Sequence, residues 1–335
     1  MTSTAARSFF ESAQRGLDWI VTHQRPDGSL CNPEDGIGSY YKVPYALTLA
    51  GHLRKAHRLL AWIAEHHFTT EGDFRAPERK AHQTCHDAWP VYSNAWLVLG
   101  AHRAGRWDIS RRGAAFLQRY QVPAGGYYAL DGETRFLEPV CTAWGGLAAL
   151  TTGDIGAATR AGDLLTRLVE EQPEPGRFYF RMETGGSLMT EVPDGGELFY
   201  YVDATRREQI YFNPGIALIF LTHLYRATGE ARYLRASHTL FHFTEHCADD
   251  VHRFPPSGKL GMGSALLYAI TGKAEARRAA IAVGTYLLET QANEGFWRLP
   301  EVAVYQAIQD KNGTEIRLDI TAEFSIFLME IAALL

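Results

Sequence analysis

The densest group of chemically active side chains lies in residues 78–92, which read ERKAHQTCHDAWPVY. His82, His86 and Asp87 supply two imidazoles and a carboxyl group within six residues. A histidine near a carboxylate can be held in one tautomer and made more basic, so we expect these three to be candidates for acid–base catalysis. Asp87 also has a simpler explanation, because it directly precedes Ala88, where we expect a helix to begin, and Asp is a favoured N-cap.

The same segment admits a zinc interpretation. Thiolate and imidazole are the ligands that zinc prefers, and Cys85 and His86 are adjacent, with Cys141 in a later segment. The chain has no Cys-x-x-Cys pair, and buried free cysteines are commonly small core residues. We therefore expect no metal and no cofactor, and keep a zinc site at Cys85, His86 and Cys141 as the alternative.

Other segments between predicted helices hold further candidates. Tyr201 and Glu138 join the catalytic set, and Glu191, Glu197 and Asp319 are additional acids. Arg206 and Arg207 could clamp a carboxylate, sulfate or phosphate, or could form surface salt bridges. The candidates for substrate binding are aromatic or cationic: Tyr41, Lys42, Trp89, Tyr92, Arg135, Arg206, Arg207 and Tyr211.

A repeat of helix pairs positions these residues. Mostly apolar segments end at a first glycine, and amphipathic segments end at a second, aromatic-flanked glycine; such periodicity indicates a repeat architecture. Glycine suits a helix end, where the left-handed conformation is common. The first series is Gly51, Gly105, Gly153, Gly229 and Gly272, and the second is Gly28, Gly72, Gly126, Gly176 and Gly295.

The two kinds of segment predict two layers. Residues 8–24 and the segment after Asp154, which we expect to be an N-cap, place apolar residues on one helical face, as outer helices do. The segments from Pro214 and Lys259 are apolar around most of their surface, which favours a buried inner layer. One opening helix, five pairs and one closing helix make twelve, and the first and last would pair to close a ring.

This pattern resembles the (α/α)6 toroid superfamily. Its members include squalene–hopene cyclases, protein prenyltransferase β-subunits, lanthipeptide cyclases, and glycan hydrolases, lyases and epimerases. The resemblance implies an all-α toroid of twelve helices and a single domain over residues 1–335. It implies little about the reaction, because one fold hosts many chemistries. The Asp-x-Asp-Asp motif of squalene–hopene-type cyclases and an Asp-Asp-x-x-Asp magnesium motif are absent. An open helical-repeat solenoid used for binding is the alternative architecture.

We expect the long outer-to-inner connections to lie on one face and carry the site. They are residues 31–43, 75–89, 129–141, 181–213, 254–261 and 299–319. The fourth, 181–213, is an insertion in which 186–203 reads as a β-hairpin with a Pro-Asp-Gly-Gly turn. It could be a lid over a ligand, an interface for a partner subunit, or a solubilising loop.

Composition limits the function class. The formal charge of −5 over 335 residues, without a basic stripe, argues against a nucleic-acid partner. No secretory signal or membrane-spanning run is present and the four cysteines are widely spaced, so we expect a cytoplasmic protein with reduced thiols.

The function predicted from these residues is a metal-independent cyclase or lyase. It would carry out elimination or intramolecular ring closure on a small anionic polar molecule, free or carrier-bound, in natural-product biosynthesis. The alternatives are a glycan-active hydrolase, lyase or epimerase, a zinc-dependent cyclase, and a non-catalytic scaffold for a partner subunit.

Overall fold

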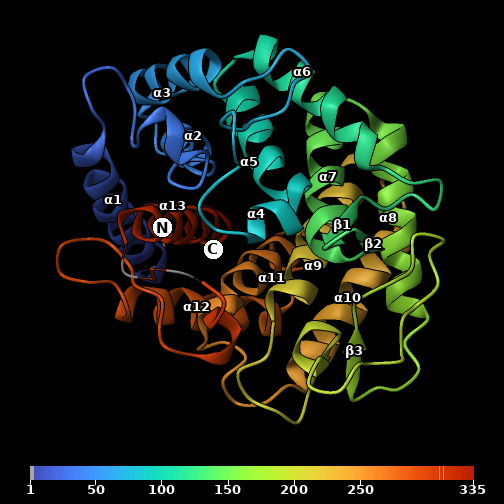
Figure 1. The fold of residues 1–335 in the computed structure, drawn as a ribbon. Helices are drawn as coiled ribbons and strands as arrows, with labels where there is room; N and C mark the ends of the chain where they lie inside the picture. Colours follow the sequence, from blue (N-terminus) through green and yellow to red (C-terminus); the bar gives the residue numbers. More distant parts are fainter. Residues whose placement is uncertain (1–3, 309, 312) are drawn as a thin grey trace.

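Two concentric rings of helices make up the protein (Figure 1). The computed structural model describes residues 4–308, 310–311 and 313–335, and twelve helices in these ranges have seven or more residues. Gln309 and Asn312, which fall in the predicted loop 299–319, lie outside the described residues. The twelve-helix (α/α)6 toroid predicted from the repeat is confirmed.

The helices alternate between the rings along the chain. The outer helices are α1 (Thr4–His23), α3 (Leu53–His66), α6 (Trp107–Leu117), α8 (Ile155–Glu170), α10 (Ala231–Glu245) and α12 (Ala274–Glu289). The inner helices are α2 (Val43–Leu49), α5 (Pro90–Arg103), α7 (Pro139–Thr152), α9 (Phe212–Thr228), α11 (Gly258–Thr271) and α13 (Thr314–Leu334). Each inner helix packs against the next, α13 packs against α2, and α1 packs against α13, which closes the ring as predicted.

The sequence pattern accounts for the two layers. Outer helix α3 buries Leu59, Leu60 and Ile63 on one face and exposes polar residues on the other. Inner helix α7 is buried continuously from Pro139 to Ala149, which is possible because its side chains are apolar or small. Asp154 caps α8, since its carboxylate accepts a hydrogen bond from the amide of Ala157 at 2.9 Å.

The first glycine series ends the inner helices as expected. Gly51, Gly105, Gly153, Gly229 and Gly272 all have φ between 69° and 94°, so a side chain at these positions would be strained. The inner helices pass into the outer ones through turns of only two or three residues.

The second series forms a tight turn after each outer helix. Gly28, Gly72 and Gly295 have positive φ, but the third position is Gly125 and not Gly126, and Gly176 has no positive φ. At Gly125 (φ 104°) an added Cβ would lie 2.3 Å from the Arg160 carbonyl oxygen of α8. Gln121 locks this turn, because its Nε2 donates to the carbonyls of Gly125 and Ala157, both at 2.9 Å. The same paired bonds recur for Gln24 with Gly28 and Lys55, and for Gln291 with Gly295 and Ser12.

The insertion contributes one strand to a small antiparallel sheet, and the pairing of this strand differs from that of the hairpin predicted at 186–203. Strand β4 (Tyr201–Asp203) pairs with β3 (Arg177–Tyr179), which precedes the insertion, while the first half of the predicted hairpin contributes only the isolated bridge between Met182 and Leu188. Strand β3 is held in place for this pairing, because the side chain of Gln172 donates to the carbonyl of Tyr179 at 2.9 Å and accepts from its amide at 2.7 Å. A further hairpin, β1 (Tyr128–Asp131) and β2 (Thr134–Leu137), was not predicted.

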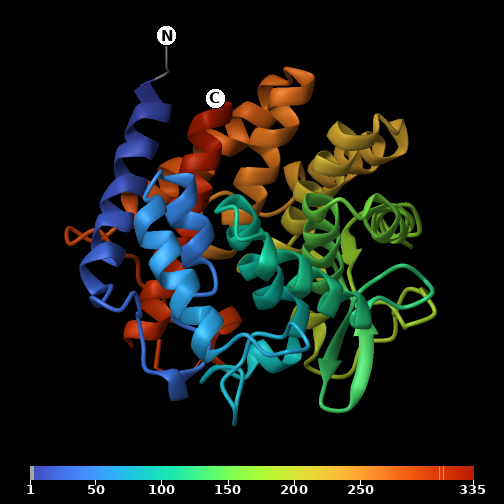
Figure 2. The same ribbon diagram turned by 90° about the horizontal axis from the view of Figure 1, so that it is seen from above.

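The long connections and the short turns lie on opposite faces of the toroid, here named the loop face and the turn face. Figure 2 shows the hairpin β1–β2 and the long connections on one side, and the C-terminal end of α13 on the other. All six inner helices therefore begin at the loop face. None of the described helices combines the length and apolar character needed to cross a lipid bilayer.

Candidate active site

A cavity of about 120 Å³ lies on the axis of the toroid, where the inner helices begin. We call it the central cavity. All six inner helices or the residues just before them contribute to its wall, which mixes apolar rings with buried charges. The main lining residues are Tyr41, Lys42, Cys85, His86, Trp89, Tyr92, Phe212, Lys259, Tyr305, Asp319 and Glu323.

A buried lysine joins two carboxylates in this cavity. The Lys42 ammonium lies 2.7 Å from Asp319 and 3.1 Å from Glu323, and its side chain is 3% exposed. Asp319 and Glu323 stand four residues apart on α13, so they project from the same face of this helix on successive turns. Lys42 directly precedes α2, which brings the loop after α1 onto the start of the last helix.

A second lysine completes the network. Lys259, in the first turn of α11, lies 2.6 Å from Glu323, and the Tyr92 hydroxyl donates to the same carboxylate at 2.8 Å. Glu323 thus receives two ammonium groups and a phenol. These donors, Lys259 and Lys42 first, lower its pKa to about 2 although burial alone would raise it.

Asp319 is held differently. Burial raises its pKa above the ordinary value, the nearby charge of Glu323 acts in the same direction, and Lys42 only partly offsets the rise. A carboxylate with a raised pKa is a stronger base than an ordinary one. The pair therefore combines a Glu323 whose ionised form is strongly favoured with an Asp319 that is more basic than an ordinary aspartate.

His86 is a neutral member of the wall. Burial lowers its pKa to about 3, and the charges of Lys42 and Lys80 act in the same direction. Its ring packs edge-on against the ring of Tyr41, with centroids 5.0 Å apart. At neutral pH the imidazole is uncharged, so it can donate a single hydrogen bond to a substrate oxygen.

Glu138 lies behind Trp89, just before α7. Burial raises its pKa to about 7, while Arg181 and the indole of Trp89 partly offset the rise. Its Oε1 is buried without a hydrogen-bond partner among the described residues, and so is Nε of Arg181. The carboxyl group is not part of the cavity wall itself, but Trp89, whose side chain acts on it through a hydrogen bond, is part of that wall.

The loop face also carries the positive ends of the inner helices. Unpaired amides at a helix N-terminus act as a partial positive charge, and six helices begin around this cavity. The formal charges of Lys42, Lys259, Asp319 and Glu323 cancel when all four are ionised. The helix ends therefore favour a substrate that brings negative charge.

The structure brings six of the sequence-predicted residues together in the central cavity. They are Tyr41, Lys42, His86, Trp89, Tyr92 and the additional acid Asp319. The signal that found them was their position in the long connections that precede inner helices.

The remaining predicted residues lie elsewhere. His82 is 44% exposed and pairs with Asp35 at 3.3 Å on the rim. Asp87 is exposed within the short helix α4 (Cys85–Ala88), and because α5 begins at Pro90 it does not cap that helix. Arg135 is exposed and stacks on Tyr128.

The arginine pair and the two insertion tyrosines are also outside the cavity wall. Arg206 and Arg207 are exposed, and Arg207 lies 3.4 Å from Asp249. Tyr201 is buried beside Tyr179, and the hydroxyl of Tyr211 donates to Asp250 at 2.8 Å. The cations that reach the cavity are thus lysines, not the predicted arginines.

The residues of the zinc alternative do not form a ligand cluster. Within the described ranges, no group of three or more His, Cys, Asp and Glu side chains is placed to hold a metal ion. Cys141 is fully buried in the core, and burial raises the pKa of the Cys85 thiol to about 12.

Sequence reasoning missed Lys259 and Glu323 as site residues and gave Asp319 only a minor place. Both missed residues lie in segments that read as buried inner helices. A charged residue in such a segment needs a buried partner, and two of opposite sign in different inner helices are candidates for a pair. That signal was present in the sequence.

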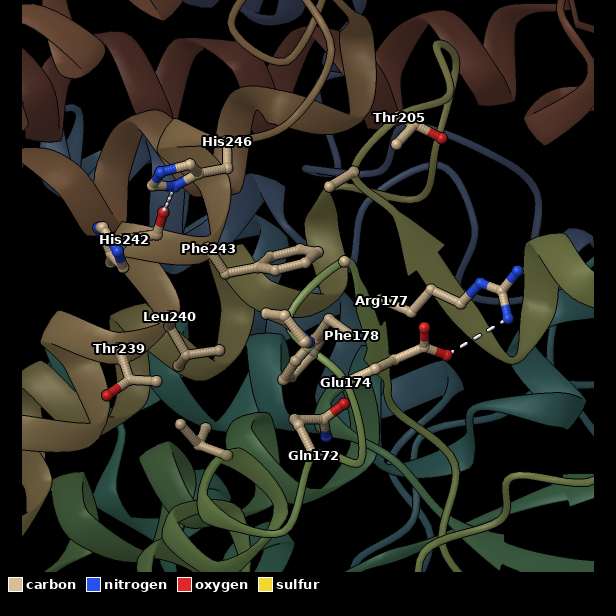
Figure 3. A pocket seen from close by; sticks show the side chains of 14 residues that line it. Gln172, Glu174, Arg177, Phe178, Thr205, Thr239, Leu240, His242, Phe243 and His246 are labelled. Atoms are coloured by element: carbon tan, nitrogen blue, oxygen red, sulfur yellow. Dashed lines mark hydrogen bonds and ion pairs between the residues drawn. The ribbon is translucent and has the colours of Figure 1, made fainter.

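A larger pocket, of about 480 Å³, lies on the outside between α8, α10 and the β3–β4 sheet (Figure 3). Its wall is mostly apolar, with Leu240, Phe243 and Phe178 inside and His242 and His246 at one edge. It contains no buried ion pair and lies in the outer layer, so we place the candidate active site in the smaller central cavity.

Comparisons with known proteins agree with this fold. No family model and no curated protein sequence matches the chain. A D-mannose isomerase matches with a TM-score of 0.71 and 12% identity over 100% of both chains. A GH76 α-mannanase of Bacteroides thetaiotaomicron matches with a TM-score of 0.66 and 13% identity over 96% of this chain and 95% of that chain.

A type II terpene cyclase from Scytonema, solved with its substrate geranylgeranyl dihydroxybenzoate, matches with a TM-score of 0.58 and 15% identity over 99% of both chains. At such identities the likeness shows the fold alone. It confirms the predicted likeness in fold to (α/α)6 toroid proteins. The three structures are of enzymes: an isomerase, a hydrolase and a cyclase.

Proposed function

We propose that this protein is a metal-independent acid–base enzyme that isomerises or epimerises a small sugar-like substrate. The observation that carries the proposal is the buried Asp319–Lys42–Glu323 network in the wall of the central cavity. It places a proton-exchanging carboxylate next to a cation that can stabilise negative charge.

The reaction would begin with proton transfer to Asp319. Its ionised carboxylate takes the proton from the carbon next to a carbonyl group, and the electron pair moves onto the carbonyl oxygen as an enolate. Transfer of the hydroxyl proton from the second oxygen to the first, followed by return of the carbon-bound proton to the neighbouring carbon, gives the isomer with its carbonyl group shifted by one carbon. Return of the proton to the other face of the same carbon gives the epimer. Both outcomes balance without an oxidant or an added co-reactant.

Lys42 and Lys259 would stabilise the enolate oxygen. Fixed cations in a site shielded from water act strongly on charge that develops in a transition state. Neutral His86 would donate to the same oxygen, since its low pKa keeps it uncharged. Tyr41 and Trp89 would hold the substrate ring or chain against the cavity wall.

The proposed substrate class is a monosaccharide or a related hydroxy-carbonyl compound, with acidic forms favoured by the helix N-termini around the cavity. The cavity of about 120 Å³ is too small for an extended polymer. Two of the three structural neighbours, the D-mannose isomerase and the α-mannanase, act on sugars by name, which supports the same class.

Glycoside hydrolysis fits this geometry less well. Hydrolases place two carboxyl groups on opposite sides of the bond, roughly 6.5–9.5 Å apart in inverting enzymes. Asp319 and Glu323 lie on one face of α13, and both lie within 3.1 Å of the same ammonium. Glu323 is further restrained by Lys259 and Tyr92, which makes it a poor nucleophile.

Elimination or ring closure on an anionic substrate is the second candidate. The observation in its favour is Glu138, whose burial raises its pKa to about 7, so that it can act as an acid near neutral pH. Movement of Trp89 would let it protonate a leaving group while Asp319 removes a proton. Both candidates therefore share the same first step.

Hydrogen exchange tests the shared step. We would incubate the protein in D2O with aldoses, ketoses, their 6-phosphates and uronic acids, and follow the hydrogen on the carbon next to the carbonyl by proton NMR. We expect exchange together with isomer formation for a subset of acidic sugars. A complete lack of exchange with every compound would contradict the proposal.

Variants assign the step to the cavity. Asp319→Asn should slow exchange by on the order of 10²- to 10⁴-fold, the usual effect of removing a general base. His82→Ala is the matched control, because His82 lies in a rim loop outside the cavity, and it should leave exchange unchanged. Full exchange in Asp319→Asn would show that another group is the base.

A further inference from the structure

A second cavity, of about 270 Å³, lies on the toroid axis toward the turn face. We call it the turn-face cavity. Aromatic rings separate it from the central cavity. Trp96 and Trp144 line the turn-face cavity, with ring centroids 4.1 Å apart. Tyr92, which lines the central cavity, packs against Trp144 with a centroid distance of 5.7 Å. The two cavities are thus distinct compartments in the same ring of inner helices.

The indole of Trp144 is an unused donor in this wall. Its side chain is 2% exposed, and its N–H has no hydrogen-bond partner among the described residues. The indole N–H of Trp96 also has no hydrogen-bond partner among the described residues, although it lies close enough to the Tyr92 hydroxyl to affect the pKa of that group. A buried donor without an acceptor is unfavourable, so an acceptor atom placed in the turn-face cavity would be stabilised.

The charges around this cavity favour a negative group. Arg103 lines it and is exposed at its mouth, and Arg226 lies close enough to lower the pKa of His223. The acid nearby is Glu330, which accepts a hydrogen bond from Tyr45 at 3.0 Å and is faced by both arginines.

The two histidines of the wall are neutral donors or acceptors. Burial and then Arg226 lower the pKa of His223 to about 4, and burial and then Arg111 lower the pKa of His102. Neither histidine adds positive charge at neutral pH. The positive potential at this end therefore comes from the arginines.

We propose that the turn-face cavity is a second ligand site, for a small carboxylic acid with an apolar body. Leu99, Leu147 and Ile219 supply apolar walls, Trp144 a deep donor, and Arg103 a cation at the mouth. The inner helices end on this face, and their partial negative charge disfavours a bare inorganic anion. Burial of an apolar body supplies the affinity that charge alone would not.

Indole NMR signals test this site without any knowledge of the reaction. The chain has seven tryptophans, and 15N-labelled indoles report each one separately. We would titrate phenylacetate, with benzylamine and benzyl alcohol as probes of the same shape. We expect saturable shifts of the Trp144 and Trp96 signals with phenylacetate, and none with benzylamine. Trp107, exposed on α6, is the internal control and should not move.

A signal change in the central cavity instead would contradict the proposal. Trp89 lines the central cavity, so a shift confined to Trp89 would place the probe there and overturn the proposal. Equal shifts with benzylamine would also overturn it, as would no shift of either turn-face indole at millimolar phenylacetate.

Two substitutions separate the contributions. Trp144→Phe removes the donor together with part of the ring, and should weaken phenylacetate binding by at least roughly threefold to tenfold, the effect expected for one hydrogen bond. Arg103→Gln should weaken phenylacetate but leave benzyl alcohol unchanged. Binding of the acid should also raise the pKa of His223, which a titration of its ring signals measures. Unchanged affinity in both variants would refute the site.

Discussion

Replacing Lys42 with Met removes the cation that joins two buried carboxylates. In Lys42→Met, Asp319 loses its ammonium partner at 2.7 Å, whereas Glu323 keeps Lys259. The methionine occupies a similar volume, so the main change is electrostatic. We expect both a loss of stability and a loss of the proposed proton transfer.

The contact distances in the structure give the size of the expected loss of stability. At an effective dielectric constant of about 20, contacts of 2.7 and 3.1 Å correspond to about 6 and about 5 kcal/mol of attraction. Desolvation of the three ions opposes most of this gain. Removal of one partner leaves a buried charge behind, so the free energy of unfolding should fall by about 3–5 kcal/mol at pH 8.

The loss should depend on pH. Without Lys42 the pKa of Asp319 rises further above its unfolded value, and a carboxyl group with a raised folded pKa loses stability as pH rises. Protonation at lower pH relieves the uncompensated charge. Urea unfolding should therefore show a smaller difference between variant and wild type at pH 5 than at pH 8.

A matched lysine distinguishes the site from general stability. Lys80 is also buried and lies 2.9 Å from Asp73, outside the central cavity. Lys80→Met should destabilise the protein without abolishing the chemistry. The double variant Lys42→Met/Asp319→Asn should regain stability but no activity. If Lys42→Met keeps wild-type stability at pH 8, or retains activity, the reasoning about this network is wrong.

Three other outcomes follow from the same physical arguments. The Glu138 carboxyl group has a folded-state pKa of about 7 in place of 4.5, so its ionisation lowers the free energy of unfolding progressively as pH rises from 4.5 to 7. Glu138→Gln should remove this cost, which is about 3 kcal/mol at pH 8. Urea unfolding midpoints of the variant and the wild type at pH 4.5 and pH 8 check this. His86→Phe should lower the exchange rate at least tenfold while His82→Phe leaves it unchanged, as the D2O assay measures. Gln121→Leu should lower the free energy of unfolding by about 1–3 kcal/mol, because the turn loses the two hydrogen bonds of the Gln121 amide. Gly125→Ala should lower it by at least as much, because the added Cβ would clash with the Arg160 carbonyl oxygen.

The toroid could be predicted because the signals behind it are local and repeated. Glycines with positive φ, such as Gly153 and Gly229, mark helix ends wherever they occur, and the inner and outer segments differ plainly in their apolar pattern. The strand pairing in the insertion could not be predicted in the same way. Residues 201–203 have β propensity, but propensity alone does not decide which strand they pair with. The sequence pattern favoured the first half of the 186–203 hairpin, whereas the structure pairs them with β3.

The residues that line the candidate site could be predicted only in part, for a related reason. The position of Lys42 and His86 in long connections marked them as candidates. Whether a side chain in such a loop is buried depends on tertiary packing, which the sequence does not show. His86 is buried in the cavity wall, whereas His82 in the same loop is exposed on the rim. Lys259 and Glu323 stand 64 positions apart in the chain, and their contact at 2.6 Å exists only because the ring closes α13 against α11.

Three carboxyl groups on helix α13 have different pKa values because their surroundings differ. Glu315, Asp319 and Glu323 follow one another at four-residue intervals from the rim into the cavity. Burial raises the pKa of Glu315 to about 7 and that of Asp319 above its ordinary value, whereas Lys259 and Lys42 lower the pKa of Glu323 to about 2. In the proposed reaction, the innermost carboxylate is thus the fixed charge and the middle one the proton acceptor. This order requires both lysines, so the chemistry of α13 is set by the helices that face it and not by its own sequence.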